Sequence, residues 1–97
     1  MGNIEFAWDR HKARTNLEKH GVSFGEARTV FLDDSARLID DPDHSEEEEE
    51  RLLLLGFSFQ ARCLIVSHSY SKSDSVIRLI SARRSTKQEE EMYWRFK

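Results

Sequence analysis

The chain has 97 residues, of which 38% are hydrophobic and 34% are charged, and this composition indicates one globular domain over residues 1–97. No apolar run approaches the roughly 20 residues that a membrane-spanning helix needs, and the pattern of a signal peptide is absent, so we expect a cytoplasmic protein without membrane contact. The net charge of −3 argues at first against a nucleic-acid partner.

The charge is unevenly distributed along the chain. Residues 32–50 contain ten acidic side chains and one basic one, whereas residues 51–97 contain nine basic and four acidic ones. The negative total therefore arises from one acidic segment, and it is compatible with a local basic face elsewhere.

The N-terminal part predicts a short strand and a first helix. The weak alternation over residues 4–8 favours the strand, and Asp9 suits the N-cap of a helix over Arg10–His20. Gly21 suits the left-handed residue that ends this helix. Its apolar residues Ala13 and Leu17 are expected to face the core.

Ser23 and Glu26 have the spacing of a capping box and predict a second helix, whose inner face carries Phe24, Ala27 and Phe31. A short strand over residues 36–40 and a turn at residues 41–43 are expected next. The glutamates at positions 46–50 are interpreted as a solvated turn. A calcium loop is rejected because the glycine of its sharp turn is missing, so we predict no metal site.

The second half predicts three strands and a closing helix. Residues 51–57 are apolar on both faces, residues 62–68 alternate, and residues 76–84 are rich in β-branched side chains. Ser85 and Gln88 are spaced as a capping box for a helix that ends near Arg95. The element order predicts an α+β fold: a small antiparallel sheet of 3–5 strands packed with two N-terminal helices and one C-terminal helix.

The strongest candidate for function is the junction between the last strand and the closing helix. Arg83 and Arg84 lie there beside the free N–H groups of a helix start, which suits an anion. Regular alternation puts Arg78 and Arg84 on one side of the strand and Arg83 on the other. The alternative is that these arginines only form surface salt bridges.

Other groups suit RNA cleavage without a metal, which needs a base, an acid and cations around the phosphate. Proton transfer is open to His20, His68, Tyr93 or a glutamate before Arg51. His20 is equally well explained as a cation at a helix C-terminus, His68 as a strand residue and Tyr93 as a core residue. Cys63, the single cysteine, is expected to be a buried, inert thiol.

Three motifs then occur together in order: KHGVSF at residues 19–24, DPDHS followed by ER at residues 41–51, and ISARR at residues 80–84. With the flanking sequence, they resemble the BrnT family of bacterial toxins over most of the chain. The resemblance implies a RelE-like fold, a ribonuclease that inhibits translation, and no cofactor. It also implies a cognate BrnA-like antitoxin that binds operator DNA, and it is compatible with a higher-order toxin–antitoxin complex.

By position in these motifs, the resemblance implies catalytic roles for five residues: Lys19, His20, Arg51, Arg83 and Arg84. One of the glutamates at positions 46–50 would join them, and the run offers no landmark to say which. Lys12, Arg78 and Lys87 are expected to bind RNA.

The helix that follows ISARR departs from the family, where it is commonly basic. Here it carries Glu89, Glu90 and Glu91, which are expected to weaken the attraction for phosphate. The leading hypothesis is a metal-independent endoribonuclease toxin. The alternative is a non-catalytic module whose basic corner binds an acidic segment of a partner protein.

Overall fold

The structure is a computed structural model that describes residues 4–40, 51–71, 73 and 75–96. Five strands form one sheet in the order β1-β5-β4-β3-β2. The strands are β1 (Glu5–Ala7), β2 (Arg37–Asp40), β3 (Leu52–Phe57), β4 (Cys63–Ser71) and β5 (Val76–Arg84). The helices are α1 (Arg10–His20), α2 (Phe24–Thr29), the 3₁₀ turn η1 (Val30–Leu32) and α3 (Lys87–Arg95).

The predicted α+β class is therefore confirmed. Strands β2 to β5 pair in an antiparallel manner, and β1 pairs with β5 in parallel, with Phe6 opposite Ile77. The sequence analysis did not predict the parallel pair. The motif and turn expected at residues 41–50 lie outside the described residues. None of the helices in the described part of the chain is long and apolar enough to cross a membrane.

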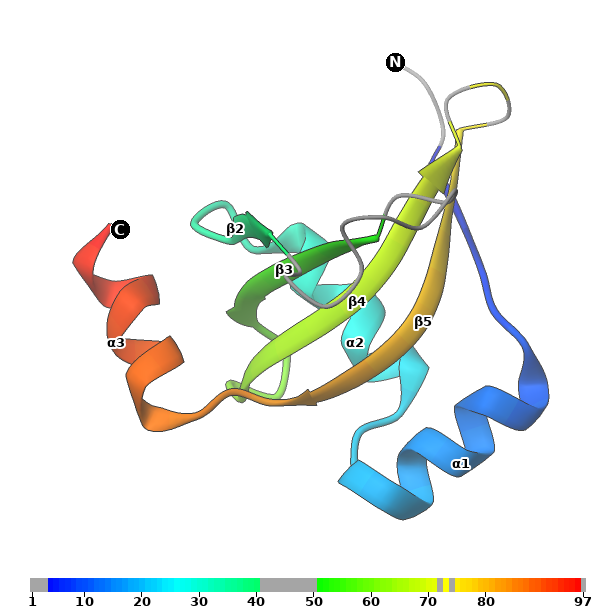
Figure 1. Ribbon diagram of the computed structural model, residues 1–97, viewed down its shortest axis with the longest axis horizontal. Helices are drawn as coiled ribbons and strands as arrows, with labels where there is room; N and C mark the ends of the chain where they lie inside the picture. Colours follow the sequence, from blue (N-terminus) through cyan, green and yellow to red (C-terminus); the bar gives the residue numbers. More distant parts are fainter. Residues whose placement is uncertain (1–3, 41–50, 72, 74, 97) are drawn as a thin grey trace.

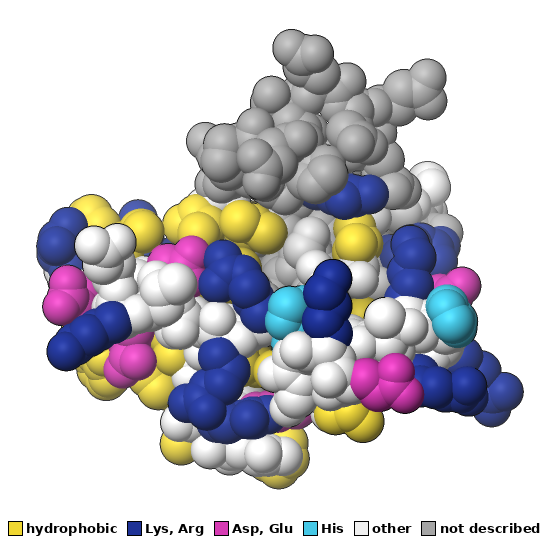
Figure 2. Space-filling view, turned by 60° about the horizontal axis from the view of Figure 1, so that its bottom comes forward, with side chains coloured by type: hydrophobic (Ala, Val, Ile, Leu, Met, Phe, Trp, Pro, Cys, Tyr) yellow, Lys and Arg dark blue, Asp and Glu magenta, His cyan; other side chains and the backbone are white. Residues whose placement is uncertain are grey.

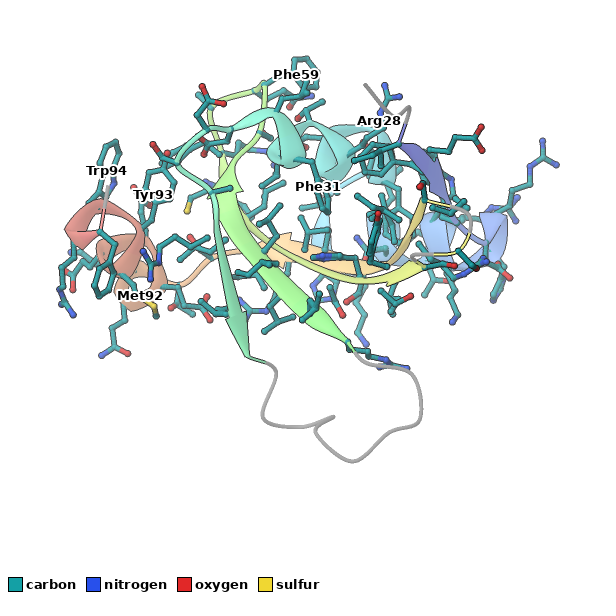
Figure 3. The ribbon with its side chains drawn as sticks, turned by 90° about the horizontal axis from the view of Figure 1, so that it is seen from above. Arg28, Phe31, Phe59, Met92, Tyr93 and Trp94 are labelled. Atoms are coloured by element: carbon teal, nitrogen blue, oxygen red, sulfur yellow. The ribbon has the colours of Figure 1, made fainter. Side chains whose placement is uncertain are left out.

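The helices lie on different sides of the sheet. Figure 3, which looks along the sheet, shows α2 and η1 on one side with Phe31 directed at the strands, and α3 at the far end of the molecule. Figure 1 shows α1 and α3 on opposite sides of the lower end of β5. We call the side of α1 and α2 the helix face, and the other side the open face.

Each face of the sheet has its own core. On the helix face, side chains of α2 and η1 pack against alternate residues of β3, β4 and β5, among them Phe24, Leu64 and Leu79. On the open face, Tyr93 of α3 packs against Leu55 and Ile65. The second core is smaller because α3 contacts mainly β3. The open face of β5 carries Val76, Arg78, Ser81 and Arg83 beside this core.

The helix ends were well predicted by local sequence. Asp9 accepts hydrogen bonds from the backbone N–H groups of His11 and Lys12, and Gly21 ends α1 with a positive φ of 71°. The expected core role of Leu17 was wrong, because its side chain is 50% exposed. The buried residue of α1 is Asn16.

Tyr93 attaches α3 to the rest of the fold. Its hydroxyl donates to Asp33 Oδ2 at 2.9 Å, and the same oxygen accepts from the backbone N–H of Phe57 at 2.9 Å. The backbone of Gly56, next to Phe57, is closely packed as well, because a Cβ added there would lie 2.9 Å from the Cβ of Ala36. The core role considered for Tyr93 is therefore confirmed.

An ion pair connects α2 to the turn between β3 and β4. Glu26 is 3% exposed and accepts from Ser58 Oγ at 2.6 Å, from Arg62 Nε at 2.9 Å, and from Arg62 Nη2. Arg62 Nη2 also donates to the carbonyl of Gly21 at 3.1 Å. Hydrogen bonds from Arg62 hold the pKa of Glu26 below its ordinary value despite the opposing effect of burial.

Replacing Glu26 tests this connection. We expect Glu26→Gln to lower the free energy of unfolding at pH 7 by about 2–3 kcal/mol, somewhat less than for a fully buried pair because Arg62 stays partly exposed. The carboxylate with the lowered pKa stabilises the fold above the ordinary glutamate range and loses this effect as the pH falls below about 4. Urea unfolding at several pH values should therefore give a flatter acid dependence for the variant. An equal acid slope in wild type and variant would contradict this, and Glu18→Gln, at an exposed carboxylate, serves as control.

Candidate functional site

Strand β5 contains a β-bulge that decides which arginines share a face. Ser67 pairs with Ser81, but the next residue, His68, pairs with Leu79, so Ile80 has no partner on β4. On the N-terminal side of the bulge Arg78 pairs with Ser69, and on its C-terminal side Arg83 pairs with Ile65. Because paired residues point to the same face, Arg78 and Arg83 both project from the open face.

The predicted grouping of Arg78 with Arg84 was therefore wrong, because it assumed a regular strand. Arg84 pairs with Leu64, which belongs to the core of the helix face. Its charge acts on Glu26 of α2 and helps to lower the pKa of that carboxyl. Arg83 and Arg84 thus start from opposite faces, as alternation predicted for this adjacent pair.

Arg83 is held by Glu89 in a bidentate ion pair. Nη1 and Nη2 lie 2.9 Å from Oε1 and Oε2, and Nη1 also donates to the carbonyl of Arg84. The ion pair raises the pKa of Arg83 and lowers that of Glu89. The side chain of Arg83 remains 40% exposed, so part of the guanidinium faces solvent in a fixed orientation.

The same glutamate closes the capping box of α3. The backbone N–H of Thr86 donates to Glu89 Oε1 at 2.8 Å, and the backbone N–H of Glu89 donates to Thr86 Oγ1 at 3.1 Å. The capping box predicted for Ser85 and Gln88 was therefore wrong, because the observed box begins one residue later, at Thr86. Ser85 still pairs with β4, because its N–H donates to the carbonyl of Cys63 at 2.9 Å. Lys87 is the first residue of α3 and is exposed.

A second group of cations comes from α1. The helix and β5 border an open hollow of about 270 Å³ that we call the α1 hollow. Lys12, Lys19 and His20 line it, and Ser81 of β5 lines its other side. Ser81 is two residues from Arg83 and shares its face, so the α1 hollow adjoins the open face.

Asn16 fixes α1 to β5, whereas the sequence predicted only that it lies close to the buried face of the helix. Its Nδ2 donates to the carbonyls of Val22 and Ala82 at 2.9 and 2.8 Å, and its Oδ1 accepts from the N–H of Ala82 at 3.0 Å. The side chain therefore pairs with Ala82 as a neighbouring strand would. An asparagine one turn before KHG, on an otherwise polar helix, was the available signal.

Arg51 lies directly before β3 and is partly buried. Leu53 and Leu55 project from the open face, so continued alternation puts Arg51 on that face as well. The pair of Leu52 with His68 places Arg51 near Ser69, whose partner on β5 is Arg78. The glutamates at positions 46–50 lie outside the described residues.

Two candidates for proton transfer are buried residues of the core. His68 is 3% exposed and stacks edge-on against Phe31 on the helix face, and burial lowers its pKa. Burial and the neighbouring Asp33 raise the pKa of Tyr93.

Cys63 is buried as expected, and burial raises its pKa. Among the described residues, no group of three or more His, Cys, Asp or Glu side chains is placed to hold a metal ion.

The candidate cations among the described residues therefore lie on α1, on β5, at the start of α3 and directly before β3. Figure 2 shows Lys and Arg side chains gathered across this side of the molecule, with histidine among them. Guanidinium, ammonium and imidazole groups around small serine side chains can bind phosphate groups and move a proton. A small α+β protein with cations gathered on one described surface is compatible with a polyanionic ligand such as RNA.

Comparison with known proteins identifies the family. Residues 8–89 match the family described as the ribonuclease toxin BrnT of type II toxin–antitoxin systems. The crystal structure of the Brucella abortus ribonuclease toxin BrnT has the same fold, with a TM-score of 0.67 and 21% sequence identity over 88% of this chain and 100% of that chain. A comparison with curated protein sequences gives no match.

The chain belongs to the BrnT family of ribonuclease toxins, because the match covers most of its length. RNA is accordingly its target and an antitoxin its partner. The resemblance derived from the three motifs is confirmed, and the likeness to the Brucella structure supports the fold alone.

The anchoring role of Asn16 can be tested by stability. We expect Asn16→Ala to lower the free energy of unfolding by about 3 kcal/mol, because it leaves one N–H and two carbonyl groups without their partner. Urea unfolding would measure this loss, with Leu17→Ala as the control at an exposed position of the same helix. A loss for Asn16→Ala no larger than that of the control would contradict the assignment.

Proposed function

We propose that this chain is a metal-independent endoribonuclease that inhibits translation, and that it cleaves RNA where the open face meets the α1 hollow. The observation that carries the proposal is the bulge of β5. It places Arg78 on the same face as the anchored Arg83 and as Ser81, which lines the α1 hollow together with Lys19 and His20. Cations from independent elements thus surround one stretch of strand.

Each group has a role that fits its chemistry. Arg83, oriented by Glu89, binds the phosphate that is cleaved, and Arg78 supports it from the same face. Lys19 and His20 provide a second cation and a proton-transfer group for the 2′-hydroxyl or the leaving oxygen.

The remaining cations extend the binding surface along the RNA strand. Arg84 acts from the helix face, next to α2, and Arg51 from the N-terminal end of β3. Lys12 and Lys87 bind neighbouring phosphates through charge alone. The described part of the surface thus offers contacts for more than one nucleotide.

The acidic start of α3 is compatible with this function. Glu89 is engaged by Arg83 and by the backbone of Thr86, so its charge is already balanced within the protein. Glu90 accepts a hydrogen bond from Trp94 Nε1 at 3.2 Å. These contacts direct two of the three carboxylates to internal partners rather than to an incoming phosphate.

The antitoxin partner is proposed to be BrnA-like and to bind operator DNA. An acidic antitoxin segment lying over the same cations would inhibit the toxin by excluding RNA. A toxin–antitoxin complex of higher order would then repress its own operon.

The nuclease assignment is tested with purified protein and total RNA in EDTA. We expect wild type to cut, and Arg83→Ala/Arg84→Ala to be slower by about 10²–10³-fold, because it loses the groups that stabilise phosphate charge in the transition state. The charge-matched control Arg14→Ala/Arg28→Ala, at exposed positions of α1 and α2, should cut at nearly the wild-type rate. Intact RNA with wild type, or equal cleavage by the Arg83/Arg84 variant, would refute the assignment.

A second prediction concerns the cell. Uncontrolled expression in a bacterial host should arrest growth, because cleavage of RNA stops translation, and co-expression of the neighbouring gene should restore it. Growth curves with and without the neighbouring gene measure both effects. Normal growth with abundant soluble protein would instead favour a protein-binding module without catalytic activity.

A further inference from the structure

The α1 hollow has the size and lining of a nucleotide subsite. We propose that it holds one nucleotide of single-stranded RNA next to the cleaved phosphate, and that it sets the preference for that nucleotide. This inference rests on the proposed ribonuclease function. It assigns His11, Thr15 and Ile80, which have no role in cleavage, to the recognition of RNA.

The charge of the α1 hollow favours an anionic ligand. Lys12 and Lys19 both line it, and seven residues of helix separate them by about 10 Å along the axis. Such a spacing leaves room for a base and a sugar between two positively charged ends. Among the described residues that line the hollow, none is acidic.

The volume and the apolar part of the lining favour a nucleotide over a bare phosphate. The hollow of about 270 Å³ is close to the lower limit for small-molecule sites. The bulged residue Ile80 contributes an aliphatic surface on which a base can lie. The rings of His11 and His20 offer stacking surfaces of the kind that proteins use for unpaired bases.

The polar side chains that line the hollow differ in their availability for hydrogen bonds to a base. The amide of Asn16 already bonds Val22 and Ala82, so it forms the wall of the hollow rather than a reader of the base. The hydroxyls of Thr15 and Ser81 line the same space and can donate or accept. Contacts to the base through Thr15 and Ser81 would therefore give a graded preference rather than a strict sequence requirement.

The wild-type protein itself gives the first test, by NMR titration with nucleoside 5′-monophosphates, nucleosides and inorganic phosphate. We expect a monophosphate to shift the amide signals of Thr15, Lys19 and Ser81, with an affinity at least tenfold higher than that of phosphate. If phosphate shifts these signals with equal affinity, or if the shifts lie elsewhere, the nucleotide subsite is refuted.

A matched pair of variants gives the second test. Thr15→Phe fills the hollow, whereas Leu17→Phe adds an aromatic ring to the same helix at an exposed residue outside it. We expect about tenfold weaker monophosphate binding and an altered nucleotide preference at mapped cut sites for Thr15→Phe only. Equal effects of the two variants would overturn the proposal. Circular dichroism checks their folding, and the wild-type titration decides the matter if Thr15→Phe does not fold.

Binding and cleavage are read separately, so the two proposals fail in different ways. Monophosphate binding in the hollow without RNA cleavage would contradict the nuclease and retain the subsite. Cleavage without binding in the hollow would contradict the subsite alone.

Discussion

The pairing of Asn16 with Ala82 is the interaction on which the site depends. Strand β1 covers only the first residues of β5, up to Arg78, and further along the strand its outer edge needs another partner. Exposed strand edges attract foreign strands, and proteins cover them in several ways. Here one amide side chain satisfies both backbone groups of Ala82 and thereby brings a helix against the edge. The cations of α1 and the arginines of β5 are consequently held in a fixed relation.

Opposite charges at the next residue of β5 serve the same purpose. A surface arginine loses side-chain entropy when it binds a phosphate, and an arginine that is already oriented loses less. Glu89 orients Arg83 and at the same time caps α3, so the position of the guanidinium is linked to the start of the helix. The acidic residue that seemed opposed to RNA binding is thus part of the support for the arginine.

The features that the sequence predicted well depend on neighbouring residues. Asp9, Gly21 and Ser23 act within one helical turn, and the alternation of β4 places Ile65 and Val66 on opposite faces as expected. The features that it missed depend on distant contacts. Two overlapping capping boxes were compatible with the sequence, and the hydrogen bond from Ser85 to Cys63 decided between them. The bulge at Ile80 leaves no local pattern, and only pairing with β4 reveals it.

The same division applies to the candidate site. The three motifs pointed to Lys19, His20 and the arginine pair, but the face on which each arginine lies follows from the register of the sheet. The contacts of Asn16 were not predicted, because an amide on a polar helix has no distinctive signature until its partners are known. The roles of the individual cations in cleavage remain predictions.

The bulge also has a geometric consequence for β5. A bulge bends its strand and increases the local right-handed twist. The outer edge of the first half of β5 pairs with β1, and the outer edge of the second half pairs with Asn16. A strand with one register would direct the backbone groups of the same alternate residues at this edge along its whole length. The extra residue at Ile80 thus lets one strand serve two neighbours of different kinds, a strand and a helix.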